Sequence, residues 1–262
     1  MNRLTLYSQL KNKMIIIISL YLVATALLYI YQRALLYFPT ENTNHTYNTN
    51  NFSNDNETIE VLTFNTGKPK ALIYFGGNGE AVAYNLLDSD FTQLFSEYTV
   101  YLLSYRGYGG SSGSPSEHGI FSDALMLYER VSVNHKTISL MGRSLGSGVA
   151  IYLASLKNVE KIALITPYDS IQSVAQNKFK IFPMPFLLKD KYDSISRVSN
   201  VKAKTLAVIA ENDDVITNKH STRLVNKFPT TQIKSITIKN TNHSTVSEAD
   251  EYYNTLKQFF SD

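Results

Sequence analysis

Cysteine and tryptophan are both absent from this chain of 262 residues. Without cysteine, the chain can form no disulfide, no zinc site built on thiolates and no cysteine nucleophile. The formal net charge is only +3, and no basic cluster of the kind that binds phosphate backbones is present. Nucleic acid is therefore not an expected partner, and no metal or cofactor is expected. The length suits one domain with enough chain for a full hydrophobic core.

One long apolar segment lies near the N-terminus. Residues 14–31 carry no charged side chain, and a helix of that length reaches roughly 27 Å, close to the hydrocarbon thickness of a bilayer. Three basic residues precede the segment and one follows it closely: Arg3, Lys11 and Lys13, then Arg33. The positive-inside bias therefore predicts a cytoplasmic N-terminus over 1–13, a single membrane anchor over 14–32 and an exported domain.

A cleaved signal peptide is the alternative interpretation of this segment. Residues 14–23 would form its hydrophobic core, and Ala24-Thr25-Ala26 would form its small-residue cleavage site. Apolar character continues past that site, which favours the uncleaved anchor. Both interpretations place the domain in the periplasm or another extracytoplasmic space.

The rest of the chain divides into a linker and a folded domain. Residues 33–58 are predicted to form the linker, because Asn, Thr and Ser dominate from Glu41 onward and few apolar side chains are available to bury. Over residues 59–262, short apolar runs alternate with helical stretches, which predicts an α/β domain with a mostly parallel sheet covered by helices on both faces. The expected strands are 60–64, 71–75, 99–104, 137–141, 161–165, 205–210 and 232–238, and the expected helices are 83–95, 117–133, 145–155, 218–227 and 247–260.

The expected strand at 137–141 leads into Gly142-Arg143-Ser144-Leu145-Gly146 and then into an apolar helix. In this G-x-S-x-G pattern the serine lies on a strained strand-to-helix turn that needs small residues at both flanking positions. The free N–H groups of the following helix point at charge that develops beside the serine. We therefore predict that Ser144 is a nucleophile.

An oxyanion hole is expected at the same edge of the sheet, because ligands gather at the carboxyl ends of parallel strands. The strand at 71–75 is followed by the glycine-rich turn Gly76-Gly77-Asn78-Gly79-Glu80. In a serine hydrolase such a turn provides one donor, and the residue after the nucleophile provides the other. The predicted donors are the backbone N–H groups of Asn78 and Leu145.

Several carboxylates could orient a catalytic histidine. Asp213, after the strand at 205–210, is the preferred residue for holding the imidazole and stabilising its charged form. Asp214 is the next choice, Glu211 lies close to the strand end, and Asp169 is an alternative one strand earlier.

The general base is predicted to be His243. It lies between the last strand and the final helix, in a loop that can reach back over the nucleophile. His220 opens a helix and is expected to be a surface or packing residue. The resulting chain order is Ser144, Asp213 and His243, which differs from the orders in chymotrypsin and subtilisin.

Three segments together resemble the α/β-hydrolases, and more narrowly their N-terminally anchored esterase, lipase and thioesterase members. They are the loop Tyr105-Arg106-Gly107-Tyr108-Gly109-Gly110-Ser111-Ser112-Gly113-Ser114-Pro115-Ser116-Glu117, the elbow Gly142–Gly148, and the stretch from Lys191-Tyr192-Asp193-Ser194 to Asp213-Asp214-Val215-Ile216. The resemblance implies an α/β-hydrolase fold with a minimal cap and a serine hydrolase that uses the triad named above. One departure is Gly76, which stands where the subgroup usually has a histidine before its oxyanion turn. This change puts substrate and rate in doubt more than reaction class.

Residues 178–188 lie where these folds insert a cap. Its apolar side chains Phe182, Met184 and Phe186 could line an acyl pocket or touch the bilayer, whereas a loop packed on the core is the alternative interpretation. The chain is thus predicted to be a membrane-anchored serine hydrolase that cleaves ester or thioester bonds of a small-molecule or lipid-like acyl substrate. A peptidase of the same fold and a catalytically silent, membrane-tethered binding protein are the alternatives.

Overall fold

The computed structural model describes residues 3–45 and 47–261. Met1 and Asn2 of the predicted cytoplasmic segment, Thr46 of the linker and Asp262 of the domain lie outside the described residues. The strands are β1 Asn48–Asn54, β2 Glu57–Phe64, β3 Lys70–Phe75, β4 Tyr98–Leu103, β5 Thr137–Arg143, β6 Lys161–Ile165, β7 Lys204–Ala210 and β8 Ile233–Ile238. The α-helices are α1 Arg3–Leu36, α2 Ser89–Leu94, α3 Glu117–Ser132, α4 Leu145–Leu156, α5 Ile171–Lys178, α6 Met184–Leu187, α7 Ser194–Arg197, α8 Asn218–Val225 and α9 Asp250–Ser261, with short 3₁₀ turns at Val82–Leu87, Val198–Asn200 and Val246–Glu248.

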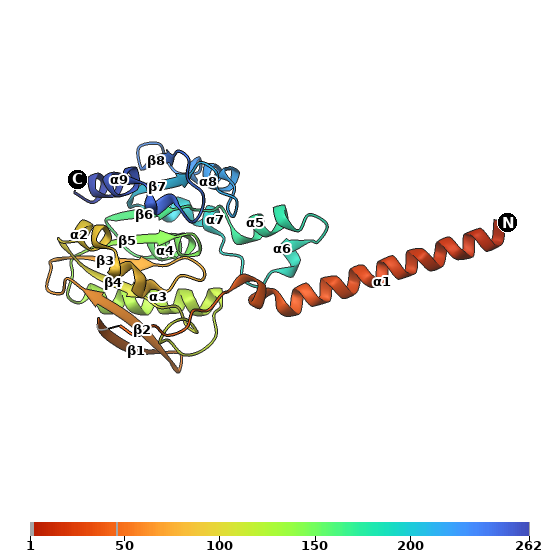
Figure 1. Ribbon diagram of the computed structural model, residues 1–262, viewed down its shortest axis with the longest axis horizontal. Coiled ribbons are helices and arrows are strands. Elements are labelled where there is room, and N and C mark those ends of the chain that lie inside the picture. The colour runs from red at the N-terminus through yellow and green to blue at the C-terminus, as the bar shows by residue number, and fades with distance from the viewer. Residues whose placement is uncertain (1–2, 46, 262) are drawn as a thin grey trace.

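The described strands form one sheet in the order β1-β2-β4-β3-β5-β6-β7-β8 (Figure 1). The pairs β1–β2 and β2–β4 are antiparallel, and every later pair is parallel. Parallel strands need long crossover connections, which here are mostly helices. The mostly parallel sheet that the alternating sequence pattern predicted is therefore confirmed.

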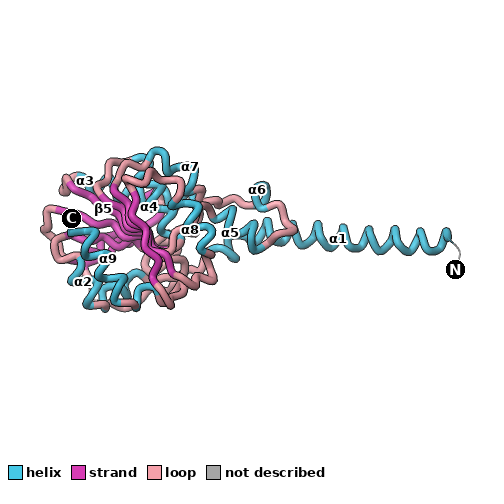
Figure 2. Tube along the Cα trace, turned by 90° about the horizontal axis from the view of Figure 1, so that it is seen from above, coloured by secondary structure: helices cyan, strands magenta, loops and turns pink. Residues whose placement is uncertain are grey.

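Helices cover both faces of the sheet (Figure 2). Successive side chains of β3 point to opposite faces, so that Ile73 and Phe75 join one core and Leu72 and Tyr74 join the other. The first core includes side chains from α3, α4 and α8, and the second includes side chains from α2 and α9. A strand that is apolar on both faces is the sequence feature that requires this double cover.

Strand β1 corrects the predicted linker. Residues 48–54 pair with β2 in antiparallel register, with Asn54 opposite Glu57. The two residues between them, Asp55 and Asn56, have φ angles of 51° and 64°. Both angles are positive, as a type I′ hairpin turn requires, and Asp and Asn tolerate this conformation well. Because backbone pairing holds this mostly exposed edge strand, its polar side chains did not reveal it.

The helix expected at 83–95 is also divided in the structure. A 3₁₀ turn ends at Leu87, and α2 begins at Ser89. Asp88 between them has an extended backbone, and its carboxylate accepts hydrogen bonds from the N–H groups of Asp90 and Phe91. This N-cap starts a new helix, because it satisfies N–H groups that have no partner within the helix.

Helix α1 extends away from the domain and carries the N-terminus with it (Figure 1). Among the described residues it is the one helix long and apolar enough to cross a membrane, over Tyr7–Leu36. The helix continues past residue 32, where the predicted anchor ends, and its last turns pack on the domain. Gln32 is buried there, and Arg33 forms an ion pair of 2.8 Å with Asp190. The first residues of the predicted linker therefore belong to the helix.

Candidate active site

The elbow at Ser144 has the strained geometry that its sequence requires. Ser144 has φ 49° and ψ −116°, a conformation that a residue with a side chain rarely adopts. A Cβ atom at Gly142 would overlap the carbonyl oxygen of Gly146, and one at Gly146 would overlap that of Phe75. Both glycines are thus needed for the close approach of α4 to the ends of β3 and β5.

Ser144, His243 and Asp213 lie in one hydrogen-bonded chain. The His243 Nε2 atom lies 2.9 Å from Ser144 Oγ, and His243 Nδ1 lies 2.8 Å from Asp213 Oδ2. The carboxylate can only accept from Nδ1, so Nδ1 carries the proton and Nε2 is free to accept from the serine hydroxyl. Ser144 and His243 are half-buried, whereas the Asp213 side chain is 1% exposed. This arrangement can move a proton from the serine to the imidazole.

Backbone groups fix the position of the Asp213 carboxylate. Its Oδ1 atom accepts hydrogen bonds from the N–H groups of Val215 at 3.0 Å and Ile216 at 2.7 Å. Its second oxygen is thereby left facing His243. On the other side, an Arg143 N–H donates to the Ser244 carbonyl at 3.2 Å, which ties the histidine loop to the elbow.

The other proposed carboxylates lie apart from this chain of hydrogen bonds. Asp214 and Glu211 are exposed, and Glu211 accepts a hydrogen bond from the N–H of Asn240. Asp169 is buried and pairs with His220, at 2.8 Å from Oδ1 to Nδ1. His220 is therefore a packing residue, as expected, although it is buried and not on the surface.

The glycine-rich turn after β3 lies beside the nucleophile. Strands β3 and β5 pair with Phe75 opposite Gly142, which brings the turn to the elbow. A Cβ atom at Gly77 would lie 3.7 Å from the Ser144 Cβ. Among the described residues, none accepts a hydrogen bond from the backbone N–H of Asn78 or Leu145. Both predicted donors are thus available to a ligand.

Sequence reasoning assigned no role to the side chains that hold this turn in place. Glu80 accepts from the Gly77 N–H at 2.6 Å, and the Tyr105 hydroxyl donates to the Gly76 carbonyl at 2.8 Å. A side chain at Gly76 would meet Val82 and the Glu80 carboxylate, so Glu80 fills the space beside Gly76. Tyr105 belongs to one of the segments on which the family resemblance rests, and that segment was the sequence signal that could have pointed to its role.

The Asn78 side chain is held from three directions. Its Oδ1 accepts from the Tyr108 hydroxyl at 2.7 Å and from the Phe38 N–H at 3.0 Å, and its Nδ2 donates to the Leu36 carbonyl. Burial raises the pKa of Tyr108 to about 12, so the phenol keeps the proton that it donates. Residues at and just after the end of α1 therefore help to position the glycine-rich turn.

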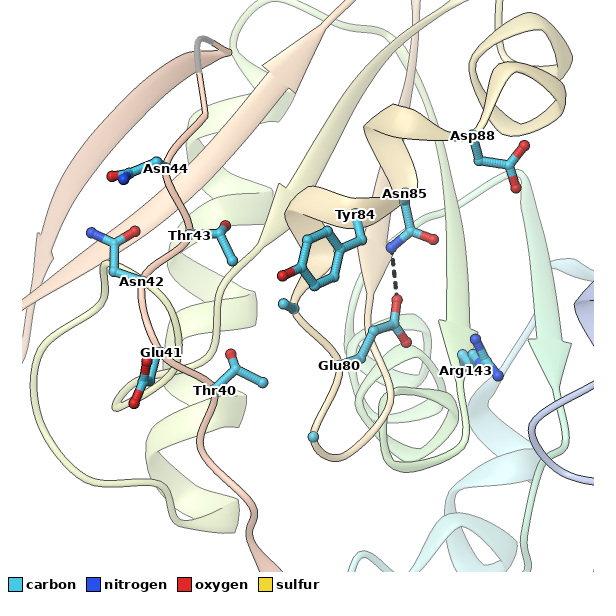
Figure 3. A pocket seen from close by; sticks show the side chains of 12 residues that line it. Thr40, Glu41, Asn42, Thr43, Asn44, Glu80, Tyr84, Asn85, Asp88 and Arg143 are labelled. Carbon is cyan, nitrogen blue, oxygen red and sulfur yellow. Dashed lines mark hydrogen bonds between the residues drawn. The ribbon is translucent and has the colours of Figure 1, made fainter.

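A pocket of about 760 Å³ lies next to this turn (Figure 3). Most of its lining residues are polar or charged, and they combine the 40–44 segment with Glu80, Asn85 and Arg143. Glu80 accepts a hydrogen bond of 2.7 Å from the Asn85 amide. The pocket can therefore hold a polar group close to the elbow.

The three cap residues proposed for an acyl pocket have different surroundings. Met184 is buried and lines an apolar pocket of about 280 Å³. Phe182 stacks on Tyr21 of α1, with ring centroids 5.3 Å apart. Phe186 is 87% exposed. Only Met184 thus lines that pocket.

Comparison with known protein families identifies the family of this chain. A family profile described as Serine hydrolase (FSH1) matches residues 95–250, a stretch that contains Ser144, Asp213 and His243. Solved structures agree on the fold. An esterase of Pyrococcus furiosus aligns with a TM-score of 0.66 at 15% identity, over 86% of this chain and 98% of the esterase. An α/β-hydrolase enzyme from a deep-sea metagenome library aligns with a TM-score of 0.65 at 13% identity, over 81% and 98%. The predicted α/β-hydrolase fold is confirmed.

Curated relatives match different lengths of the chain. An uncharacterized protein of Mycobacterium tuberculosis is 37% identical over 131 residues, which are 48% of this chain and 47% of that protein. This chain thus spans about half the length of the mycobacterial relative. Protein bem46 of Schizosaccharomyces pombe is 23% identical over 98% of this chain and 95% of its own. Alpha/beta hydrolase domain-containing protein 17C of Mus musculus is 28% identical over 70% of this chain and 58% of its own.

Proposed function

Because this chain belongs to the FSH1 family of serine hydrolases, we propose that it hydrolyses carboxylic ester or thioester bonds of acyl substrates through an acyl-enzyme on Ser144. The observation that carries the proposal is the continuous chain of hydrogen bonds from Ser144 through His243 to Asp213. A base that accepts from the nucleophile, and an acid that orients the base, are the two requirements of nucleophilic acyl transfer.

In the first half-reaction the Ser144 hydroxyl attacks the acyl carbon, and its proton passes to His243 Nε2. The bond to the leaving oxygen or sulfur then breaks, and the leaving group takes the proton from Nε2. In the second half-reaction a water molecule attacks the acyl-enzyme while Nε2 accepts its proton. Cleavage of the Oγ–acyl bond releases the carboxylic acid, and Nε2 returns the proton to Ser144. Asp213 holds the imidazole tautomer throughout.

The backbone N–H groups of Asn78 and Leu145 act as the oxyanion hole. Both groups belong to backbone that is held in place before the reaction, so they stabilise developing charge with little reorganisation. Removing one such donor from a serine hydrolase typically costs about 10²–10³-fold in kcat. The polar pocket beside the turn accommodates the leaving group, and Arg143 is its cationic lining residue.

Helix α1 crosses the membrane with the N-terminus in the cytoplasm, and the hydrolase domain lies on the opposite, extracytoplasmic side. Lys11 and Lys13 precede the apolar segment and support this orientation. The chain has no cysteine, so a single one at the exposed Val133 gives an unambiguous label. Val133→Cys is expected to react with a membrane-impermeant maleimide on intact cells, and Tyr7→Cys only after lysis. The reverse pattern would contradict the topology.

Ser144→Ala is the direct test of the chemistry. It is expected to lower hydrolysis of short acyl esters by roughly 10⁶-fold and to abolish labelling by an active-site phosphonate. Ser155→Ala is the matched control, because that hydroxyl lies on α4, the helix that follows Ser144, and among the described residues it hydrogen-bonds only to the Tyr152 carbonyl. Aminoacyl amides assayed in parallel separate esterase from peptidase activity. Full activity of Ser144→Ala would refute the proposed mechanism.

A further inference from the structure

An apolar pocket of about 280 Å³ lies between the end of α1 and the cap. We call it the anchor–cap cleft, and the cap is taken as residues 171–188. Leu28, Leu35 and Leu36 of α1 form one wall, and Ala175, Phe179 and Met184 of the cap face them. The buried amide of Gln32, also in the lining, donates to the Leu187 carbonyl and accepts from the Lys189 N–H. Its polar atoms are therefore satisfied. Lys178 is the one charged residue among the described lining residues, and the remaining apolar side chains suit an apolar ligand.

The cap follows α1 over several turns of the helix. Tyr21 stacks on Phe182, and its hydroxyl donates to the Ile181 carbonyl at 2.9 Å. At the other end, Arg33 pairs with Asp190. Arg33 lies twelve positions after Tyr21 in the helix, a distance of roughly 18 Å along the axis. The tip of the cap thus lies alongside the helix toward its N-terminus, as Figure 1 shows.

This contact determines the depth of the cap in the membrane. Tyr21 lies inside the segment 14–32 that is proposed to cross the bilayer, so its partners Ile181 and Phe182 lie at the same depth. Ile181 is 72% exposed, although it is large and apolar. Such a side chain at that depth faces hydrocarbon and not water. The cleft therefore has one wall, at Leu28 of α1, within the proposed span, and the exposed Lys178 also lines it.

One wall residue of the cleft is hydrogen-bonded to the turn beside the reactive centre. Leu36 lines the cleft, and the carbonyl of Leu36 accepts a hydrogen bond from the Asn78 side chain. The backbone N–H of Asn78 is the proposed oxyanion donor. Leu36 therefore belongs to the wall of the cleft and is also hydrogen-bonded to the turn beside Ser144.

We propose that the anchor–cap cleft binds the acyl chain of a membrane lipid-like substrate, and that the membrane helix itself forms one wall of this site. This proposal rests on the proposed hydrolase function and membrane span. An apolar cavity of about 150 Å³ already holds benzene, so a cleft about twice as large has room for a segment of alkyl chain. The helix then serves both as tether and as part of the specificity site.

Filling the cleft tests its role in chain-length selection. Ala175→Phe is expected to lower the ratio of kcat/KM for palmitoyl over butyryl esters by roughly tenfold or more, because a few methylenes lose their contacts. The ratio cancels any loss of folded enzyme. Ser173→Phe is the control, on the same helix but outside the lining, and should keep the ratio within about twofold. An unchanged ratio in Ala175→Phe would overturn the proposal, whereas a wild type inactive on both esters would overturn the hydrolase function.

Fluorescence supplies a test that does not depend on activity. Because the chain has no tryptophan, Phe179→Trp places a single indole at the cleft. In vesicles of lipids brominated on their acyl chains, this indole is expected to be quenched, as is Leu20→Trp in the span. Phe64→Trp, in β2 of the domain, should remain unquenched. If Leu20→Trp is quenched and Phe179→Trp is not, the proposal is overturned. If Leu20→Trp is not quenched, the membrane span is overturned instead.

Discussion

Two histidine–aspartate pairs of almost identical geometry occur in this domain. His243 and Asp213 are joined at 2.8 Å, and so are His220 and Asp169. In each pair Nδ1 faces the carboxylate, so Nε2 is the atom left to accept a hydrogen bond. The pairs therefore differ not in their own bond but in what surrounds it.

In the pair of His220 and Asp169, neighbouring side chains occupy the remaining hydrogen-bonding positions. His220 Nε2 lies 2.7 Å from the Asn177 side-chain amide, and Arg223 donates to Asp169 at 3.2 Å. His243 Nε2 instead faces the Ser144 hydroxyl on a strained turn. A histidine–aspartate pair can thus be structural or catalytic, and the third group distinguishes them. Three sets of variants test this contrast.

The largest effect is expected from His243→Gln. Glutamine cannot take the serine proton, so kcat for acyl esters should fall by roughly 10⁶-fold, as when the base of a serine protease is removed. The stability of the protein in detergent should change little, because His243 is only half-buried. Activity within tenfold of wild type would show that another group acts as the base.

A smaller loss is expected from Asp213→Asn. The N–H groups of Val215 and Ile216 require an oxygen at Oδ1, so the new amide NH₂ faces His243 Nδ1. The imidazole must then accept there and carry its proton on Nε2, which is the wrong tautomer for the base. The equivalent change in a serine protease costs about 10⁴-fold in kcat. The matched variant Asp169→Asn should retain activity within a few fold when corrected for folded protein, and a loss comparable to that of Asp213→Asn would contradict the distinction between the two pairs.

The smallest effect on catalysis is expected from His220→Gln. This change breaks a buried hydrogen bond to Asp169, so the free energy of unfolding should fall by about 1–3 kcal/mol. Specific activity of the folded protein should stay within about twofold. Denaturant unfolding followed by circular dichroism measures the first quantity, and His118→Gln, at an exposed position, is the control. A selective loss of activity with unchanged stability would give His220 a catalytic role.

Much of the fold could be predicted because buried parallel strands leave apolar runs in the sequence. All seven expected strands occur, with their ends displaced by a few residues. Strand β1 was missed because it is held by backbone pairing at an exposed edge, which polar side chains do not reveal. Asp88 likewise looked like part of a helix, and only its cap geometry shows that one helix ends and another begins there.

The candidate site divides in the same way. Ser144 could be singled out because its flanking glycines are a local requirement of the turn, and His243 because of its place after the last strand. Glu80, Tyr105 and Tyr108 could not be assigned, since each acts through a contact made only when the loops meet. The role of Leu36 and Phe38 was least predictable, because these residues lie 42 and 40 positions before Asn78, the residue to which they are hydrogen-bonded.

The sequence by itself determined the class of fold, the strained turn at Ser144 and an apolar helix long enough to cross a membrane. These features depend on the order of residues along the chain, through hydrophobic period, glycine placement and unbroken apolar length. Only the tertiary structure decided which aspartate is hydrogen-bonded to which histidine, and how the end of α1 packs against the cap. Those outcomes depend on distances between residues that are far apart in the chain, and packing of the complete domain sets those distances.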